Sequence, residues 1–160
     1  MSARTIGKLA ASILICQAVG LLGALFTKPA IPSWYASLQK PWFSPPNWLF
    51  APVWTSLYVM MGVAAFVVWH HGLRSKKIKV ALGLFALQLA LNALWSPVFF
   101  GLQSPLTGLV VIVLLWIALV LTIISFFRAS FAAGMLLVPY IAWVTFAGLL
   151  NVSLWILNRC

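Results

Sequence analysis

Long apolar runs separated by short polar or basic stretches dominate the chain. Five of these runs are close to the roughly 20 residues that an α-helix needs to cross the hydrocarbon core of a bilayer. They predict membrane-spanning helices over residues 6–26, 46–69, 78–100, 106–127 and 131–157. The second helix is extended upstream to residue 46, because the apolar run from residue 52 is short for a bilayer. The pattern predicts one domain over residues 1–160, an all-α membrane protein with a five-helix bundle.

Composition favours membrane insertion over a soluble fold. The 160 residues are 64% hydrophobic and 6% charged, whereas a soluble domain is nearer half apolar and about a quarter charged. Ten Lys and Arg residues and no Asp or Glu give a formal net charge of +10. The lack of carboxylates excludes paired-carboxylate hydrolases and Ser-His-Asp triads. The two cysteines, Cys16 and Cys160, match no metal motif, so no metal site is predicted.

The basic residues lie between the apolar runs, so they indicate topology and contact with anionic lipid, not nucleic-acid binding. Five crossings place the two ends of the chain on opposite sides of the membrane. One side would carry Arg4, Lys8, Arg74, Lys76, Lys77, Lys79 and Arg128, and the other Lys28, Lys40 and Arg159. Since positive charge prefers the cytoplasm, the N-terminus is predicted to be cytoplasmic. Cleavage of the first run as a signal peptide is the alternative, which the length of the run disfavours.

The loop over residues 27–47 differs in composition from the apolar runs. It contains Pro29, Pro32, Pro41, Pro45 and Pro46, together with Trp34, Tyr35, Trp42 and Phe43. Proline restricts the backbone, and Trp and Tyr favour the membrane interface. Two interpretations follow from this composition, an ordered cap over one end of the bundle and an ordinary interfacial aromatic belt.

Polar side chains recur at helical spacing in the third run, where Gln88, Asn92, Trp95 and Phe99 share one face. Amides are costly in lipid, so this face is predicted to point into the bundle. There the amides either tie helices together or contact a ligand. The opposite face carries Gly83, Ala86, Ala90 and Ala93, which favours close helix contact within the chain or in a homodimer.

Two further runs carry aromatic faces that would complement this one. They are Trp54, Tyr58, Met61 and Ala65 in the second run, and Tyr140, Trp143, Ala147 and Asn151 in the fifth. Such stripes are usually packing, but Trp and Tyr have polar tips that need hydrogen-bond partners. Three inward faces of this kind would enclose a flat, amphipathic, aromatic ligand in an apolar pocket with few polar groups.

Four long motifs carry a resemblance to a known family. They are Trp34-Tyr35-x-x-Leu38-x-Lys40-Pro41-Trp42-x-x-Pro45-Pro46-x-Trp48, Pro52-Val53-Trp54-Thr55-x-Leu57-Tyr58-x-x-Met61-Gly62, Gln88-Leu89-x-Leu91-Asn92-x-x-Trp95-Ser96-Pro97-x-Phe99-Phe100-Gly101, and Val138-Pro139-Tyr140-x-Ala142-Trp143-x-x-Phe146-Ala147-x-x-Leu150-Asn151. In this order they resemble the TspO/MBR family of tryptophan-rich sensory proteins and translocator proteins, once called peripheral-type benzodiazepine receptors. The resemblance covers nearly the whole chain.

The resemblance implies a five-helix membrane bundle, often homodimeric, whose first long loop closes a ligand cavity. It implies binding of porphyrins, other tetrapyrroles, isoquinoline carboxamides and benzodiazepines, with a sensory or transport role and no required cofactor. The implied ligand-binding residues are Trp54, Tyr58, Gln88, Asn92, Trp95, Trp143, Phe146, Ala147 and Leu150, and the implied cap residues are Trp34, Trp42, Pro45 and Pro46. A bacterial cell membrane, inner or outer, is the expected location.

An enzyme-like role is the implied alternative. Trp54 and Trp143 occupy positions that the family links to light- and oxygen-dependent porphyrin breakdown. An indole beside a photosensitiser can be oxidised without an acid or a metal. Export of a lipophilic cation is disfavoured, because small multidrug antiporters typically couple transport through an intramembrane carboxylate and this chain has none. Sterol binding is disfavoured as well, because the segment from Leu150 to Trp155 lacks the tyrosine of the family's sterol pattern.

Overall fold

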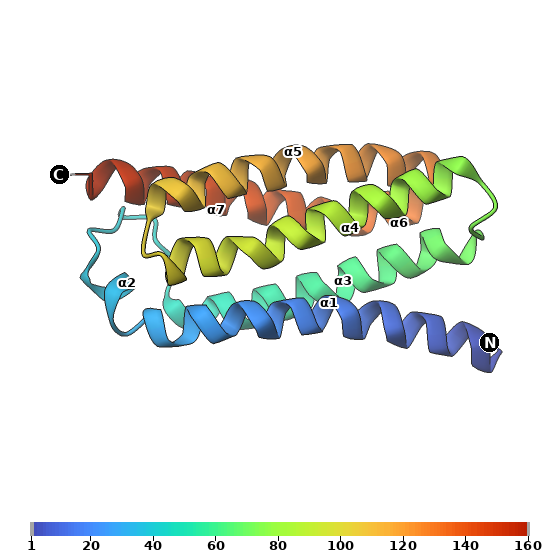
Figure 1. The fold of residues 1–160 in the computed structure, drawn as a ribbon, viewed down its shortest axis with the longest axis horizontal. Coiled ribbons are helices and arrows are strands. Elements are labelled where there is room, and N and C mark those ends of the chain that lie inside the picture. The colour runs from blue at the N-terminus through green and yellow to red at the C-terminus, as the bar shows by residue number, and fades with distance from the viewer. Residues whose placement is uncertain (1, 160) are drawn as a thin grey trace.

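Five membrane-length helical spans lie side by side along the long axis of the molecule in a computed structural model that describes residues 2–159 (Figure 1). The spans are α1 (Ala3–Ala30), η1 with α3 (Asn47–Leu49 and Phe50–His70), α4 with η2 (Lys76–Ser96 and Pro97–Gly101), α5 (Pro105–Ala129), and α6 with α7 (Phe131–Leu136 and Val138–Leu157). A short helix, α2 (Trp34–Ser37), lies in the loop between the first two spans. The predicted all-α fold with five spans is confirmed.

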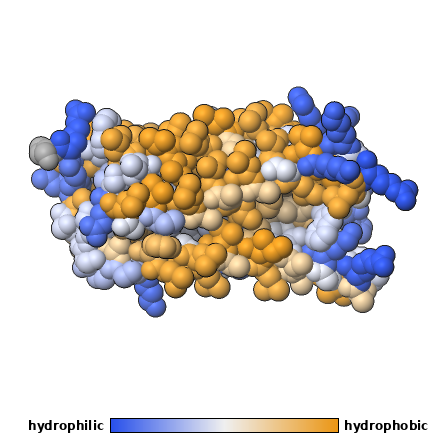
Figure 2. Space-filling model, in the orientation of Figure 1, coloured by the Kyte–Doolittle hydropathy of each residue, from blue (hydrophilic) through white to orange (hydrophobic). Residues whose placement is uncertain are grey.

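The surface has an apolar middle and polar ends (Figure 2). Leu14 and Leu21, in the middle of α1, are 67% and 70% exposed. In a bilayer these side chains face lipid, and the helices satisfy their own backbone hydrogen bonds, which is the condition for crossing hydrocarbon. The chain is therefore a multi-pass integral membrane protein.

Helix packing follows the short connections between the later spans. α4 packs on α5, and α5 packs on α6 and α7, because the short connections make consecutive spans antiparallel neighbours. α1 packs on α3 and α4 and completes the bundle. The α1 and α3 backbones approach closely at Gly62, where an added Cβ would lie 2.6 Å from Cα of Ile13. Glycine thus allows two helix backbones to approach, as small residues do between helices in membranes.

The first helix is longer than the predicted range of 6–26. Its start is capped by the Ser2 hydroxyl, which accepts a hydrogen bond from the backbone N–H of Thr5. At its other end the helix continues through Pro29 to Ala30. Proline removes one backbone donor, but near a helix end that lies at the membrane surface the freed carbonyl can reach water. The connecting loop therefore begins at residue 31 and not at residue 27.

Two prolines alter the third and fifth spans. Pro97 begins a π-helical turn, η2, in which the N–H of Leu102 donates to the carbonyl of Pro97 over 3.1 Å. The fifth span, predicted as one helix over residues 131–157, is interrupted at Leu137 and forms α6 and α7. Pro139 has no N–H to continue the ladder across this point, so the chain makes a turn there.

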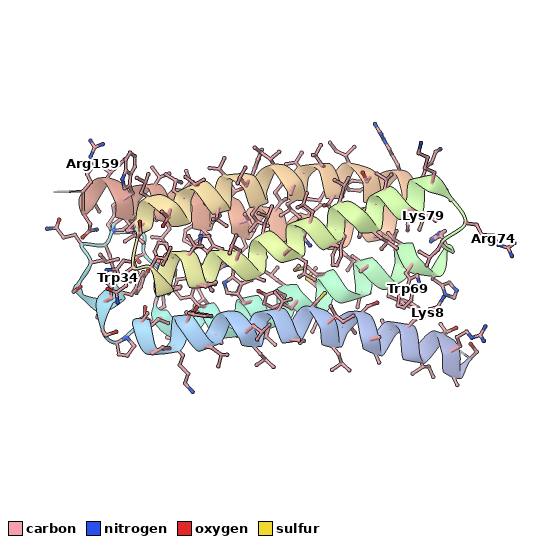
Figure 3. All side chains as sticks on the ribbon, in the orientation of Figure 1. Lys8, Trp34, Trp69, Arg74, Lys79 and Arg159 are labelled. Carbon is pink, nitrogen blue, oxygen red and sulfur yellow. The ribbon has the colours of Figure 1, made fainter. Side chains whose placement is uncertain are left out.

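The basic side chains lie at the two ends of the bundle. Lys8, Arg74 and Lys79 lie at the end that holds the N-terminus and the α3–α4 turn, and Arg159 lies at the opposite end with Trp34 (Figure 3). The Lys8 ammonium is 5.1 Å from the centroid of the Trp69 ring, a cation–π contact at the bundle end. Gly72 closes the α3–α4 turn with a φ of 89°, a conformation that glycine adopts without strain.

Candidate ligand-binding cavity

A cavity of about 450 Å³ lies between α1, α3, α4, α5 and α7, in the half of the bundle nearer α2. This volume falls within the range of pockets that hold drug-sized ligands. Its wall is mainly apolar, and Trp54, Trp95 and Trp143 contribute from α3, α4 and α7. Three indoles from three helices therefore surround a single space.

The indoles are held by other aromatic rings. Trp54 stacks on Tyr58, with ring centroids 5.6 Å apart and planes 29° apart. Trp95 stacks on Phe99, with centroids 5.0 Å apart and planes 17° apart. Trp143 meets Phe50 edge to face at 6.2 Å. Because ring pairs in these geometries attract one another beyond their area of burial, the cavity wall is ordered before any ligand arrives.

A buried hydrogen-bond chain closes the inner end of the cavity. The Tyr58 hydroxyl donates to Oδ1 of Asn92 over 2.6 Å, and Nδ2 of Asn92 donates to the Tyr140 hydroxyl over 2.8 Å. The Tyr140 hydroxyl in turn donates to Oε1 of Gln88 over 3.0 Å. The chain joins α3, α4 and α7. Asn92 ties helices together and also lines the cavity, so its two predicted roles are compatible.

Replacing Asn92 by leucine should destabilise the bundle. The change leaves the Tyr58 hydroxyl without an acceptor in a buried site, and an unsatisfied buried hydroxyl costs about 1–3 kcal/mol. We expect the midpoint of thermal aggregation in detergent to fall by several degrees. Tyr58→Phe breaks one of the two hydrogen bonds that Asn92→Leu breaks, so a smaller fall is expected. An equal fall for both variants would contradict this account of the chain.

The structure brings most of the predicted ligand-binding residues to the cavity. Those that line it are Trp54, Tyr58, Asn92, Trp95, Trp143, Ala147 and Leu150. Gln88 is completely buried behind Tyr140, at the end of the hydrogen-bond chain. Phe146 lies behind the wall, 5.4 Å from the Trp143 ring and 6.3 Å from the Phe43 ring. Gln88 and Phe146 therefore support lining residues.

The predicted cap residues lie in the loop, away from the cavity wall. Trp34 packs edge to face on Phe99 at 5.4 Å, within an aromatic cluster next to the cavity. Trp42 is 95% exposed, Pro45 is partly exposed, and Pro46 is exposed just before η1. The loop contributes Tyr35 to the wall instead. Burial raises the pKa of Tyr35, so its phenol is neutral at physiological pH.

The loop is hydrogen-bonded to the end of α7 through the side chain of Asn158. The N–H of Gln39 donates to Oδ1 of Asn158 over 2.9 Å, and Nδ2 of Asn158 donates to the carbonyl of Gln39 over 3.0 Å. Together with the contact between the Phe43 and Phe146 rings, this pair holds the middle of the loop over the bundle end. It joins residues that are 119 positions apart in the chain.

Asn158→Ala should loosen the loop and speed ligand release. Both hydrogen bonds to Gln39 are lost, and the exposed pair contributes about 1–2 kcal/mol. We expect the dissociation rate of a bound porphyrin, measured by stopped-flow displacement, to rise about three- to tenfold. Ser153→Ala is the control on the same helix, because the Ser153 hydroxyl bonds only within α7, to the carbonyl of Leu149. Equal rates for both variants would show that the loop does not retain the ligand.

The wall that α1 contributes to the cavity was not predicted from the sequence. α1 contributes residues that include Gly20, Gly23, Ala24 and Thr27, none of which belonged to a predicted face. Glycine at position 20 makes room for Tyr58, since an added Cβ would lie 2.5 Å from the tyrosine ring. The small residues Gly20, Gly23 and Ala24, which lie in an apolar run of otherwise bulky side chains, could have indicated this wall.

The cavity also opens toward the lipid face between α1 and α3. Leu21 lines it and is 70% exposed, and the lining residues Ala51 and Thr55 on α3 are exposed as well. Lys28 is the charged side chain among the lining residues. Since the chain has no Asp or Glu, the electrostatics of this opening favour neutral or anionic ligands over cations.

Comparisons with known proteins identify the family of the chain. The profile of the TspO/MBR family matches residues 12–156. The chain is 53% identical to the tryptophan-rich protein TspO of Chlorobaculum tepidum over 152 residues, which are 94% of this chain and 95% of the relative. It is 46% identical to that of Archaeoglobus fulgidus, over 94% of this chain and 97% of the relative. It is 44% identical to the translocator protein of Bos taurus, over 85% of this chain and 81% of the relative. The chain belongs to the TspO/MBR family.

Proposed function

We propose that this protein is a membrane receptor or carrier that binds porphyrins and related lipophilic ligands, such as isoquinoline carboxamides and benzodiazepines, between its helices. The observation that carries the proposal is the cavity of about 450 Å³ with indoles from α3, α4 and α7. Flat aromatic ligands stack on such rings, and the polar tips of the indoles orient them. Relatives named tryptophan-rich sensory protein and translocator protein support a sensory or transport outcome.

Ligand access from the bilayer is consistent with this role. A lipophilic porphyrin partitions into lipid, and the cavity opens to the lipid face beside Leu21. Lys28 also lines the cavity, where it would attract the propionate groups of a porphyrin. No cofactor is required for binding. The ligand's own conjugated ring supplies the surface that the cavity recognises.

Titration of the detergent-purified protein with protoporphyrin IX, in the dark, tests the proposal. Tryptophan fluorescence should be quenched in a saturable manner, because Trp54, Trp95 and Trp143 line the cavity. An isoquinoline carboxamide should compete with the porphyrin. Quenching that rises linearly, and that the competitor does not relieve, would indicate porphyrin dissolved in the micelle and would contradict the proposal.

Light-dependent porphyrin degradation is a second candidate function. It is favoured by the placement of Trp54 and Trp143 in the cavity wall, where an excited porphyrin and oxygen would meet oxidisable rings. The activity requires a defined product at more than one equivalent per chain under illumination in air. Product formation that ends at one equivalent, or that free tryptophan reproduces, would leave binding as the function.

The same proposal includes the placement of the protein in the membrane. The N-terminus and the α3–α4 turn, which carry Lys8, Arg74 and Lys79, would face the cytoplasm of a bacterial cell (Figure 3). Gly83, Ala86 and Ala90 lie on the exposed side of α4 and Ala93 is partly exposed, so this stripe would suit a homodimer contact. In a Cys160→Ser background, which removes the native thiol at the opposite end of the chain, labelling of Arg74→Cys by an impermeant thiol reagent in intact cells would contradict the orientation.

A further inference from the structure

Most of the cations of the chain lie at one end of the bundle, which we call the basic end. This end holds the start of α1, the α3–α4 turn and the start of α4, with Lys8, Arg74 and Lys79 (Figure 3). α5 ends there as well, because it runs antiparallel to α4 (Figure 1). The seven basic residues of this end are Arg4, Lys8, Arg74, Lys76, Lys77, Lys79 and Arg128.

No acidic side chain of the protein can neutralise these charges. The chain has no Asp or Glu, so none of the seven can form an ion pair with a side-chain carboxylate. Lys8 lies over the Trp69 ring, and it is the one member of the seven with a cation–π contact among residues 2–159. At the opposite end, by contrast, Lys40 and Arg159 lie over aromatic rings at 4.6 Å and 5.3 Å. The basic end therefore has more charge and less internal compensation.

The start of α4 holds the closest grouping of these charges. Lys76, Lys77 and Lys79 lie in its first turn and are exposed, and Ser75 precedes the helix without a side-chain cap. Cations are unfavourable there, because the free N–H groups of a helix start carry partial positive charge. Lys76 and Lys79 are also neighbours on the helix surface, where like charges repel. An external anion would relieve both costs.

The basic end borders the surface that lies in the bilayer. Figure 2 shows hydrophilic side chains directly beyond the apolar middle of the molecule at this end. In α4, the charged first turn is followed at once by Val80, an exposed apolar residue. Lipid phosphates lie next to the hydrocarbon, and the long side chains of Lys and Arg extend their charged heads to this interface. Clusters of basic residues beside a membrane-spanning helix attract anionic lipids for this reason.

We propose that the basic end is a docking surface for anionic phospholipids, with the start of α4 as its centre. The lipid phosphates pair with Lys76 and Lys79 and complement the N-terminus of α4. The basic residues of α1, the α3–α4 turn and α5 attract further anionic headgroups. A zwitterionic headgroup brings no net negative charge, so phosphatidylglycerol is preferred over phosphatidylcholine. The surface is separate from the ligand cavity, which lies in the half of the bundle nearer α2.

Competition between two lipids tests the surface. The detergent-purified protein is equilibrated with equal amounts of dioleoyl phosphatidylglycerol and dioleoyl phosphatidylcholine, and the lipids retained through gel filtration are counted by mass spectrometry. We expect about fivefold or more phosphatidylglycerol, since even one basic residue near anionic lipid contributes a factor of about five. In about 0.5 M NaCl the excess should fall toward onefold, because salt screens exposed charges. Equal retention at low salt, or an excess that salt does not reduce, would overturn the proposal.

Two matched double variants assign the preference to the start of α4. Lys76→Gln/Lys79→Gln should lower the phosphatidylglycerol excess to below half of its value, and both side chains are exposed, so the fold should be kept. Lys40→Gln/Arg159→Gln removes two charges at the opposite end and should keep the excess. An excess that survives in the first variant, or that falls equally in both, would overturn the assignment.

Thermal scans in phosphatidylcholine give a readout of opposite sign. Without anionic lipid, Lys76→Gln/Lys79→Gln should unfold at the same temperature as the natural protein or at a higher one, because repulsion at the helix start is relieved. Added phosphatidylglycerol should raise the midpoint of the natural protein more than that of the variant. A lower midpoint for the variant in phosphatidylcholine, or an equal rise for both proteins, would overturn the start of α4 as the centre of the surface.

Discussion

Replacing Trp143 by alanine is expected to weaken protoporphyrin binding by at least tenfold, and Trp54→Ala should do the same. Each change removes one aromatic face from the cavity wall. Stacking of a flat ring on an aromatic side chain contributes about 1–3 kcal/mol, and 1.4 kcal/mol corresponds to a factor of ten in affinity. Trp54→Ala also removes the ring that stacks on Tyr58. Fluorescence titration in the dark measures both dissociation constants.

Trp116→Ala is the matched control for these two variants. Trp116 lies in α5, is 42% exposed, and donates to the hydroxyl of Thr145 over 2.9 Å. It lies outside the cavity wall, and its removal subtracts one indole from the fluorescence signal while leaving the proposed site intact. Unchanged affinity is expected. If all three variants bind porphyrin as the natural protein does, the cavity is not the binding site.

Gly62→Ala is expected to lower stability strongly, because it adds a methyl group between two helix backbones. The new Cβ would lie 2.6 Å from Cα and 2.9 Å from the backbone nitrogen of Ile13, so α1 would have to move away from α3. Overpacking of this kind costs about 1–3 kcal/mol. For a chain of this size we expect the thermal midpoint to fall by roughly 3–10 °C. Since α1 forms one wall of the cavity, porphyrin affinity should fall as well.

Gly83→Ala provides the comparison for the Gly62 variant. Gly83 lies on the exposed side of α4, where an added Cβ meets no atom within 4 Å in the described chain. Alanine has the higher helix propensity, so this change should be neutral or slightly stabilising. Thermal scans of the two variants in the same detergent distinguish the effect of close helix packing at position 62 from the effect of helix propensity at position 83. Equal midpoints would contradict the close contact between α1 and α3.

The fold was predictable from the sequence because a bilayer allows few solutions. A run of about 20 apolar residues must satisfy its backbone as a helix, so the number and order of the spans followed directly. The exact ends of the spans could not be predicted in this way. Pro29, predicted to lie in the loop, lies inside α1, whereas the run that contains Pro139, predicted as one helix, breaks at Leu137 just before it. Which neighbouring groups compensate a missing N–H depends on tertiary packing that periodicity does not contain.

The candidate site was predictable where its residues are polar or aromatic. Periodicity placed Trp54, Asn92 and Trp143 on inward faces, and all three line the cavity. It did not separate Gln88 from Asn92, which lie one turn apart on the same face of α4. Asn92 reaches the cavity, whereas Gln88 lies deeper in the bundle behind Tyr140, and the pattern along one helix does not show this difference. The wall from α1 carried no signal, because glycines such as Gly20 contribute by leaving space.

The structure of the complex with protoporphyrin IX, determined from protein prepared in the dark, tests the central claim most directly. The account predicts density for the porphyrin ring inside the bundle, in contact with Trp54, Trp95 and Trp143. It also predicts that the hydrogen bonds among Tyr58, Asn92 and Tyr140 persist beneath the ligand. Porphyrin bound only on the lipid-facing surface or outside the 31–46 loop, with the cavity filled by lipid or detergent, would contradict it.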